Sequence, residues 1–407
     1  MSSQLDGARS LRISVRASFA SVSTAGRSSI VSLIPEKHLN LDADPNGMTT
    51  SNVIRLVRKM NSHIRDAPLQ ARALMLIRNL VQDEFSADRL VEYGAGTAVL
   101  NAMRRHQNDA EIQASSCGAI CNLCFSSVNS IILMKSGAAG LVIQAMEAYP
   151  KDEILQEEGL KALTNLEHGD IGRKSILISL GAARLVVQAL RNHSHNQYLM
   201  EEACAAVGSL EEGFVTDGED GVKDDVTEDF YTMGALNLIV EVMKIHARSV
   251  EVQIEATEAL KSVTALPWLN DRKLSALENG AAEMVSSAMQ FFSADADMQL
   301  TGCAFITAIG STDNERVTKK MIELDLPKRV LEAMKNNLGN GDEDIQVRGI
   351  FAIFNICFGK KDMAVYLNKN GAKNVIDTAV RRYKNNSQIK KNAISAQKLL
   401  KKKGQLQ

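Results

Sequence analysis

Aromatic residues, proline and long apolar runs are all scarce in this sequence. Phe, Trp and Tyr together make up 4% of the 407 residues, and there are one Trp and six Pro. A core with few aromatic rings has to be built from Ala, Leu, Ile, Val and Met, which pack well between helices. No apolar run approaches the roughly 18 residues that a membrane-spanning helix needs, and the N-terminus has no compact apolar secretory segment. We therefore expect a folded, non-membrane protein rich in helix.

Net charge and paired cysteines are also lacking. The 47 Lys and Arg nearly cancel the 48 Asp and Glu, so total charge points to no class of partner, and no nucleic acid is expected. Six cysteines show no spacing typical of a disulfide framework, which favours reduced buried thiols in an intracellular compartment. A cytoplasmic location is the expectation, with an organelle or the nucleus as alternatives.

A repeated pattern runs through the chain, and it predicts the fold. Gly-Ala pairs open successive amphipathic stretches, and 28 residues after five of these glycines comes a landmark position inside a second apolar stretch. An earlier repeat starts at Ser51 and reaches Asn79 after 28, and a later one starts at Asp325 and reaches Asn355 after 30. The repeat starts fall at residues 51, 94, 137, 181, 234, 280, 325 and 371. The period is 43 to 46 residues, with one step of 53.

Each repeat contains three helical segments. Two stretches have apolar residues spaced by three and four, and about fifteen residues before the next Gly leave room for a short third helix. The Gly allows a sharp corner because it has no Cβ. A glutamine stands nine residues before most landmarks and sets the phase of the second helix, at Gln70, Gln113, Gln156, Gln253, Gln299 and Gln346.

This pattern resembles the armadillo-repeat family over residues 51 to about 400. The resemblance implies an all-α fold, a right-handed armadillo-type α-solenoid of about eight three-helix repeats, and a non-enzymatic protein–protein interaction scaffold. A two-helix HEAT-type solenoid is the alternative, and the Gly-Ala corner with its preceding short helix argues against it. We expect the solenoid to occupy residues 48–400.

Three segments depart from the repeat. Residues 1–47 are rich in Ser and Arg, which predicts a disordered tail, with a cleaved transit peptide as the alternative. Residues 211–229 hold nine acidic side chains and one Lys, which predicts an acidic loop between repeats. Residues 401–407 are expected to form a basic C-terminal tail.

The landmark asparagines are the main candidates for partner binding. In armadillo proteins that bind extended peptides, inner helices present Asn in register, and an amide can both donate to and accept from a peptide backbone. This sequence matches that pattern at Asn79, Asn122, Asn165 and Asn355 and departs from it at Ser209, Ser262 and Ala308. The alternative is that each Asn bonds a neighbouring turn within its own repeat.

Charge along the predicted groove favours a basic partner. Seven residues before the landmark stand Arg72, Glu158, Glu202 and Glu255, among others, so the centre of the groove would be acidic. The same charges could instead form only a solvated face. The family's nuclear-import receptors carry Trp at the position four residues before the landmark. This sequence has no Trp at that position in any repeat, which argues against a receptor of that kind. We predict a protein partner with an extended or helical segment of basic character, bound in the concave groove.

Two other classes of function remain open. Cys117, Cys121 and Cys124 form the C-x3-C-x2-C spacing of some iron–sulfur enzymes, but they also fall at repeat positions that take small apolar side chains. His193 and His195 are expected to be solvated turn residues. We therefore expect no cofactor and no metal, and a structural subunit of a larger assembly is the other alternative.

Overall fold

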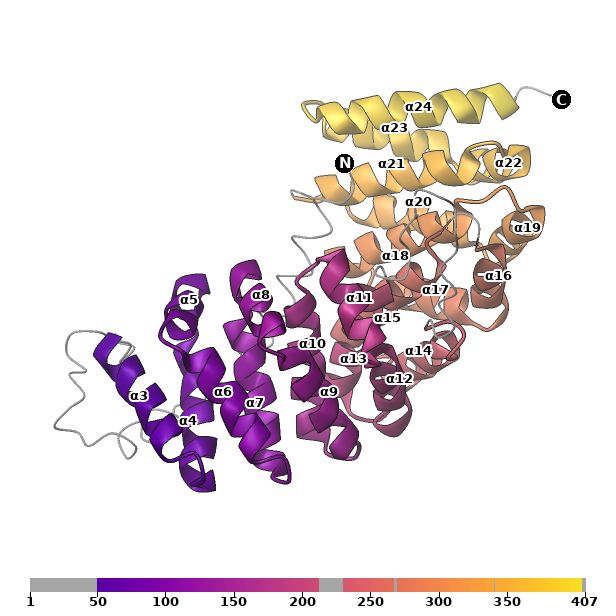
Figure 1. Cartoon of the computed structure of the whole chain (residues 1–407). Coiled ribbons are helices and arrows are strands. Elements are labelled where there is room, and N and C mark those ends of the chain that lie inside the picture. The colour runs from indigo at the N-terminus through magenta and orange to yellow at the C-terminus, as the bar shows by residue number, and fades with distance from the viewer. Residues whose placement is uncertain (1–49, 212–229, 267–268, 340, 405–407) are drawn as a thin grey trace, which may run out of the picture. The chain divides into compact units, whose positions relative to one another are not determined.

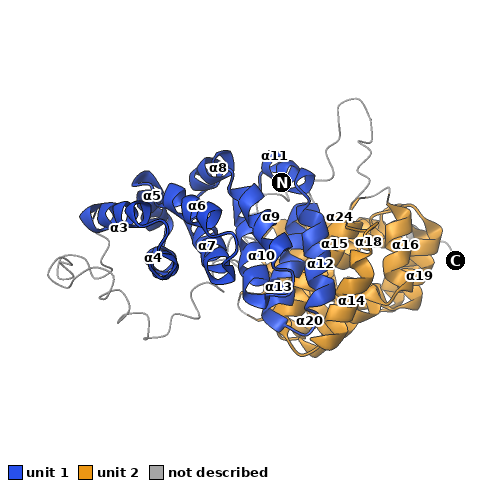
Figure 2. Ribbon diagram, turned by 60° about the horizontal axis from the view of Figure 1, so that its bottom comes forward, with its two compact units in different colours: residues 1–229 blue, residues 230–407 orange. Residues whose placement is uncertain are grey.

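The computed structural model describes residues 50–211, 230–266, 269–339 and 341–404. All regular structure in these ranges is helical (Figure 1). The chain divides into two compact units, residues 1–229 and 230–407 (Figure 2). Each unit is a stack of helical repeats, and together they confirm the predicted all-α solenoid of armadillo type.

Unit 1 contains repeats one to four. Its helices are α3 (Thr50–Ser62), α4 (Ala67–Leu80), α5 (Glu84–Glu92), α6 (Ala95–Arg105), α7 (Ala110–Leu123), α8 (Ser127–Lys135), α9 (Ala138–Ala148), α10 (Glu153–Glu167), α11 (Ile171–Ser179), α12 (Ala182–Asn192) and α13 (Gln197–Glu211). The second helix of each repeat packs on the second helix of the next, so that α4, α7, α10 and α13 form one layer.

Unit 2 contains repeats five to eight. Its helices are α14 (Ala235–Ile245), α15 (Val250–Thr264), α16 (Asn270–Glu278), α17 (Ala281–Phe291), α18 (Ala296–Gly310), α19 (Glu315–Glu323), α20 (Leu326–Asn336), α21 (Glu343–Cys357), α22 (Lys361–Lys369), α23 (Ala372–Arg382) and α24 (Ser387–Gly404). Here α15, α18, α21 and α24 form the corresponding layer. We call the helices of these two layers the inner helices.

The corner between repeats is a left-handed backbone position, as the Gly-Ala pattern predicts. Gly94 has φ 87° immediately before α6, a conformation that costs a residue without Cβ little. Asp325 takes the same place before α20 with φ 53°, and aspartate is one of the few side chains that tolerate it. The non-glycine start of repeat seven therefore keeps the geometry of the others.

The recurring glutamine fastens the inner helix to the end of the helix before it. Gln113 is buried, and its Nε2 donates to the main-chain oxygens of Met103 and His106, both at 2.9 Å. The other five glutamines make the same pair of bonds. Carbonyls at a helix end lack partners within their helix, so one buried amide satisfies two of them in each of these repeats.

Several predictions about the irregular parts differ from the structure or lie outside it. The predicted tail, residues 1–47, and all but Glu211 of the predicted acidic loop lie outside the described residues; Glu211 itself ends α13. At the C-terminus α24 continues to Gly404, so the basic segment predicted to begin at 401 starts within a helix.

The prediction for His193 was wrong. This side chain is buried, and its Nε2 lies 2.9 Å from the main-chain oxygen of Pro150 in the preceding repeat. His106 makes the equivalent contact with Ile64, at 2.6 Å. A polar turn sequence concealed a contact between repeats, because the bonded carbonyl lies about one repeat upstream. His195 is exposed, as expected.

Candidate functional site

The inner helices of unit 1 carry most of the residues predicted to bind a partner. Arg72 and Asn79 lie on α4, Asn122 on α7, and Asn165 and Glu158 on α10. Glu202 lies on α13. The remaining two, Glu255 on α15 and Asn355 on α21, belong to unit 2. The candidate site described below is therefore the layer α4, α7, α10 and α13 (Figure 2).

Two of the landmark asparagines tie neighbouring inner helices together. The Nδ2 of Asn122 donates to the main-chain oxygen of Arg78 on α4 at 2.9 Å. The Nδ2 of Asn165 donates to the main-chain oxygen of Cys121 on α7, also at 2.9 Å. Each bond spans 44 residues, so the amide reaches the preceding repeat and not its own.

The other asparagines lie differently. Asn355 donates to the main-chain oxygen of Phe351 within its own helix, at 2.8 Å. Asn79 is half-buried on α4, the first inner helix. The four predicted residues thus do not form one uniform row of amides. A partner that binds at Asn122 or Asn165 has to share an amide that already links two repeats.

An ion pair crosses α7 at the centre of this layer. Arg78 on α4 and Glu158 on α10 are 2.8 Å apart, with 29% and 8% of their side chains exposed. They meet because Gly118 on α7 has no side chain between them. A Cβ on Gly118 would lie 2.7 Å from Oε2 of Glu158 and 3.1 Å from Nη1 of Arg78. Arg78 of repeat one and Glu158 of repeat three therefore meet across α7 of repeat two.

A second group of charges adjoins this pair on α10 and α13. Lys161 lies 2.5 Å from Glu157 and 4.0 Å from Glu202. Burial raises the pKa of Glu202 to about 8, although the Lys161 ammonium acts in the opposite direction. Burial opposes the charge on Lys161, but the nearby carboxylates outweigh it and raise the pKa of that lysine. Glu201 also acts on Glu202, so Glu157, Glu158 and Glu201 outnumber the cations Lys161 and Arg78 even when Glu202 carries its proton.

The charges at the edges are arranged less simply than the pattern suggested. Arg72 is exposed, and its Nε donates to the main-chain oxygen of Pro68 one turn back on α4. Glu158, Glu202 and Glu255 are all buried. Arg78 and Gly118 were not predicted to act together, because their relation to Glu158 depends on the register of three successive repeats.

Apolar side chains are exposed on the same layer. Met75 on α4 is 50% exposed, and Ile154 and Tyr198, the second residues of α10 and α13, are 68% and 70% exposed. Exposed apolar side chains beside charged groups are typical of protein interaction surfaces. The layer therefore combines polar, charged and apolar contacts.

The three cysteines of the C-x3-C-x2-C pattern belong to the core of unit 1. Cys117, Cys121 and Cys124 are buried in or directly after α7. Burial raises the pKa of all three thiols, that of Cys124 to about 12. Metals and nucleophilic chemistry require the thiolate, which this environment disfavours. Within the described residues, no group of three His, Cys, Asp or Glu side chains is placed to hold a metal ion.

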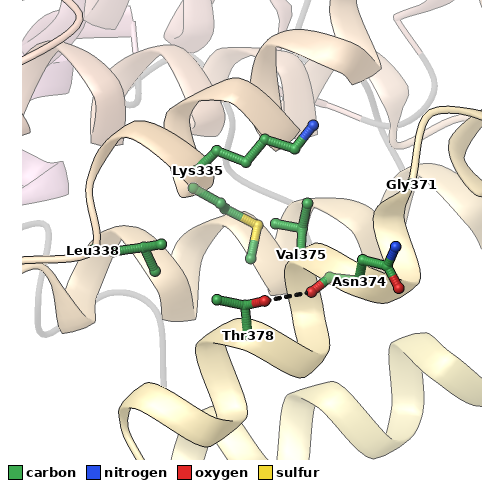
Figure 3. A pocket seen from close by; sticks show the side chains of 7 residues that line it. Lys335, Leu338, Gly371, Asn374, Val375 and Thr378 are labelled. Atoms are coloured by element: carbon green, nitrogen blue, oxygen red, sulfur yellow. Dashed lines mark hydrogen bonds between the residues drawn. The ribbon is translucent and has the colours of Figure 1, made fainter.

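One surface cavity lies apart from the predicted residues. It has a volume of about 230 Å³ and lies between α20 and α23 in unit 2 (Figure 3). Met334, Leu338 and Val375 contribute its apolar part, and Lys335, Asn374 and Thr378 its polar part. None of the predicted site residues lines it.

No single helix in the described part of the chain is long and apolar enough to cross a membrane. Helices α8 and α9 taken together are long and apolar enough, but they are bent by 73° relative to each other.

Comparisons with known proteins bear on the fold. The family model described as LRRK2 ARM repeat matches residues 49–264, just over half of the chain. No curated protein matches. A solved structure from a study of the phosphorylation switch in the interaction between cadherin and beta-catenin is similar with a TM-score of 0.64 and 12% identity, covering 95% of this chain and 68% of that one. The crystal structure of an engineered protein is similar with a TM-score of 0.53 and 18% identity, covering 65% of this chain and 97% of that one.

These identities are low, so the two structures show likeness of fold alone. The family match is independent of them and spans α3 to α15. It agrees with the repeat starts, the left-handed corners and the three-helix repeats described above. The chain belongs to the armadillo-repeat family described as LRRK2 ARM repeat.

Proposed function

We propose that this protein is a non-enzymatic scaffold that binds a segment of a protein partner on the inner helices of unit 1. The armadillo fold suggests a protein-interaction scaffold. The observation that supports this face is the excess of carboxyl groups around Lys161, on a layer that also exposes Met75, Ile154 and Tyr198. A basic, partly apolar segment, extended or helical, complements such a surface.

The asparagines and the carboxylates have different roles in this proposal. An extended segment leaves main-chain donors and acceptors that cost roughly 1–3 kcal/mol each when buried without a partner. Asn79 offers an amide for them on α4, and Asn122 and Asn165 offer theirs in addition to the bonds that each makes to the preceding repeat. Glu157 and Glu201 are half-buried and lie at the edge of the charged group, where they meet a basic side chain.

A peptide selection tests the proposal. Peptides displayed on phage are selected on the full chain, and the affinity of the best is measured by fluorescence anisotropy at two salt concentrations. We expect selected peptides to be basic, and added salt to weaken their binding, since screening reduces exposed charge interactions. Glu157→Gln and Asn79→Ala should each weaken binding several-fold. Glu241→Gln on α14 and Asn385→Ala, both at exposed positions in unit 2, should not.

Other outcomes would contradict the proposal. Selection of acidic or charge-free peptides would contradict the predicted partner chemistry. Equal binding by the Glu157 and Glu241 variants would place the interaction on another surface. A cytoplasmic location belongs to the same proposal, and imaging of a fluorescent fusion protein tests it.

A further inference from the structure

A row of exposed apolar side chains lies on the short helices α8 and α11 of unit 1. Its members are 39% to 63% exposed. They are Val128, Ile131 and Ile132 on α8, Ile171 and Ile176 on α11, and Leu180 directly after α11. We call this set the apolar ridge. In both views α5, α8 and α11 follow one another along the same edge of unit 1 (Figures 1 and 2).

The polarity of α11 is inverted with respect to an ordinary surface helix. Its two cations, Arg173 and Lys174, are buried, whereas Ile171 and Ile176 face solvent. Arg173 Nε donates to the main-chain oxygen of Glu167 at 2.9 Å, and Lys174 lies 4.0 Å from the Glu167 carboxylate. A surface helix normally keeps its charged side chains outward. Because α11 has two charged side chains and buries both, its exposed isoleucines do not result from a lack of polar residues.

The fold itself does not require an apolar ridge. The corresponding helices α16 and α19 in unit 2 expose charged side chains, among them Asp271, Arg316 and Lys319. The exposed positions of α8 and α11 include no acid, and Lys135 is their one cation. Short helices of the same kind thus tolerate charge in unit 2, and the ridge in unit 1 indicates a contact.

The size of the ridge indicates what covers it. Six large side chains, each about half exposed, amount to an apolar patch on the order of 500 Å², which is typical of a functional patch. A standard interface between two proteins needs about 800 Å² from each partner. The ridge alone is too small for a stable dimer of this chain and suits a single short segment.

A short apolar segment of this chain is within reach of the ridge. The described part of the chain begins at Thr50, whose Oγ1 accepts a hydrogen bond from Arg89 on α5. The residues before Thr50 lie outside the described part, and only their sequence enters here. Residues 28–35 read SSIVSLIP and carry no charge, with Ile30, Val31, Leu33 and Ile34 as the apolar members.

The length of the chain before Thr50 and the composition of residues 28–35 both fit a contact with the apolar ridge. Fifteen residues, 35–49, separate Ile34 from Thr50, and an extended chain of that length reaches about 50 Å. The ridge is nearer, because packed helices are about 10 Å apart and α8 and α11 follow α5 by one and two repeats. Neither the segment nor the six side chains of the ridge carry charge, so contact between them buries no unpaired ion. A tether of this length also raises the effective concentration of the segment at the ridge.

We propose that the segment 28–35 binds in cis to the apolar ridge of α8 and α11. This contact lies on the short helices and is independent of the partner site proposed for the inner helices. It would hold the Ser-rich start of the chain against unit 1. Ser28, Ser29 and Ser32 lie within the segment, so a phosphate on one of them would add charge to an apolar contact and release it.

Limited trypsin digestion of the full chain tests the contact. Arg27 and Lys37 bracket the segment, and Arg12 and Arg16 serve as reference sites in the same molecule. The quantity measured is the cleavage rate at Arg27 and Lys37 divided by that at the reference sites. We expect the double variant Ile132→Asp/Ile176→Asp to raise this ratio at least about fivefold, since cleavage follows the population of the undocked segment.

Two further variants make the result specific. Ile34→Asp changes the segment and should raise the ratio by a similar factor without touching a described helix. Val365→Asp on α22 is the matched control, since Val365 is 46% exposed on a short helix of unit 2, and it should leave the ratio unchanged. Circular dichroism checks that each variant is folded, and Ile34→Asp decides the matter if the ridge variant is not.

An equal ratio in the wild-type chain and the Ile34→Asp variant would overturn the proposal. So would a wild-type dimer in analytical ultracentrifugation that dissociates in the ridge variant while the cleavage ratio stays constant, because a second copy would then cover the ridge. Neither result would affect binding of a basic peptide to the inner helices, so the two proposals can fail separately.

Discussion

At the scale of single residues, short contacts between successive repeats determine what each polar side chain can do. Glu202 on α13 shows this most clearly. Its carboxyl is buried beside Lys161, and three other glutamates lie close enough to act on it. The same residue type at an exposed position would be a solvated charge. Its position in the stack makes it a group whose protonation is coupled to folding.

Stability should therefore fall as pH rises from about 5 to 9 through the contribution of Glu202. Its pKa in the folded protein is about 8, above the value of roughly 4.3 for an unfolded chain. The folded state binds the proton more tightly, so this stabilisation is present below the unfolded pKa and is lost as pH rises through the folded one. Urea unfolding at several pH values measures it. Glu202→Gln should reduce the slope with pH, whereas the neighbouring Glu201→Gln should have a smaller effect; equal slopes in all three proteins would show that Glu202 is charged in the fold at neutral pH.

Replacing Gly118 by alanine should not stabilise the protein. Alanine in place of glycine inside a helix usually adds about 0.5–1 kcal/mol of stability. Gly140 on α9 has no atom near the position of a Cβ, so Gly140→Ala should show that gain. In Gly118→Ala the new methyl group meets Glu158 and Arg78 and separates their charges. Thermal unfolding of the two variants compares them, and an equal gain would mean that the bridge over α7 contributes nothing.

At the scale of helices, the buried glutamines connect each inner helix to the helix before it. Gln113→Leu removes two hydrogen bonds and leaves the main-chain oxygens of Met103 and His106 without this donor. We expect a loss of about 2 kcal/mol, since a buried unsatisfied group costs roughly 1–3 kcal/mol. Urea denaturation measures it against Gln82→Leu, a change at an exposed glutamine that should cost less than about 0.5 kcal/mol. A loss no greater than that of the control would contradict the role assigned to the glutamine.

The last helix, α24, should act as a cap for unit 2. Ile389, Ala396 and Leu400 are buried in its contact with α21 and α22. Ala396→Asp places a charge in that contact and should cost more than about 2 kcal/mol, because a buried charge without a partner is strongly unfavourable. Ser395→Asp, one residue away and exposed, should change stability by less than about 0.5 kcal/mol. Equal thermal midpoints for the two variants would show that α24 is not packed on the unit.

The helices were predictable from the sequence and many of their contacts were not. Gly-Ala pairs and glutamines recur at fixed intervals, so repeat starts and helix phases can be read from spacing alone. The bond from Asn165 to Cys121, by contrast, joins residues 44 apart, and periodicity does not say which atom an amide will reach. The Arg78–Glu158 pair depends on an absent side chain at Gly118. The apolar ridge carries no periodic signal, because α16 and α19 in unit 2 do not share it.

At the scale of the whole molecule, we propose that a protein partner binds to the inner helices of unit 1. Both units expose apolar side chains on their inner helices, such as Met75 and Tyr198 in unit 1 and Phe351 and Ile394 in unit 2. The group of carboxyls around Lys161 belongs to unit 1. The proposed function is binding, not a reaction that could be assayed. It has to be tested by locating the partner on the surface.

Site-specific photo-crosslinking does this most directly. A photoreactive phenylalanine analogue is placed in the full chain at Met75 or Ile154 on the inner helices, or at Ile245 or Val365 in unit 2, all of which are exposed. After irradiation with a basic peptide selected on the wild-type protein, mass spectrometry identifies the crosslinked residues. We predict crosslinks from Met75 and Ile154, and far fewer from Ile245 and Val365. Crosslinks from the two unit 2 positions without any from the inner helices of unit 1 would contradict the account.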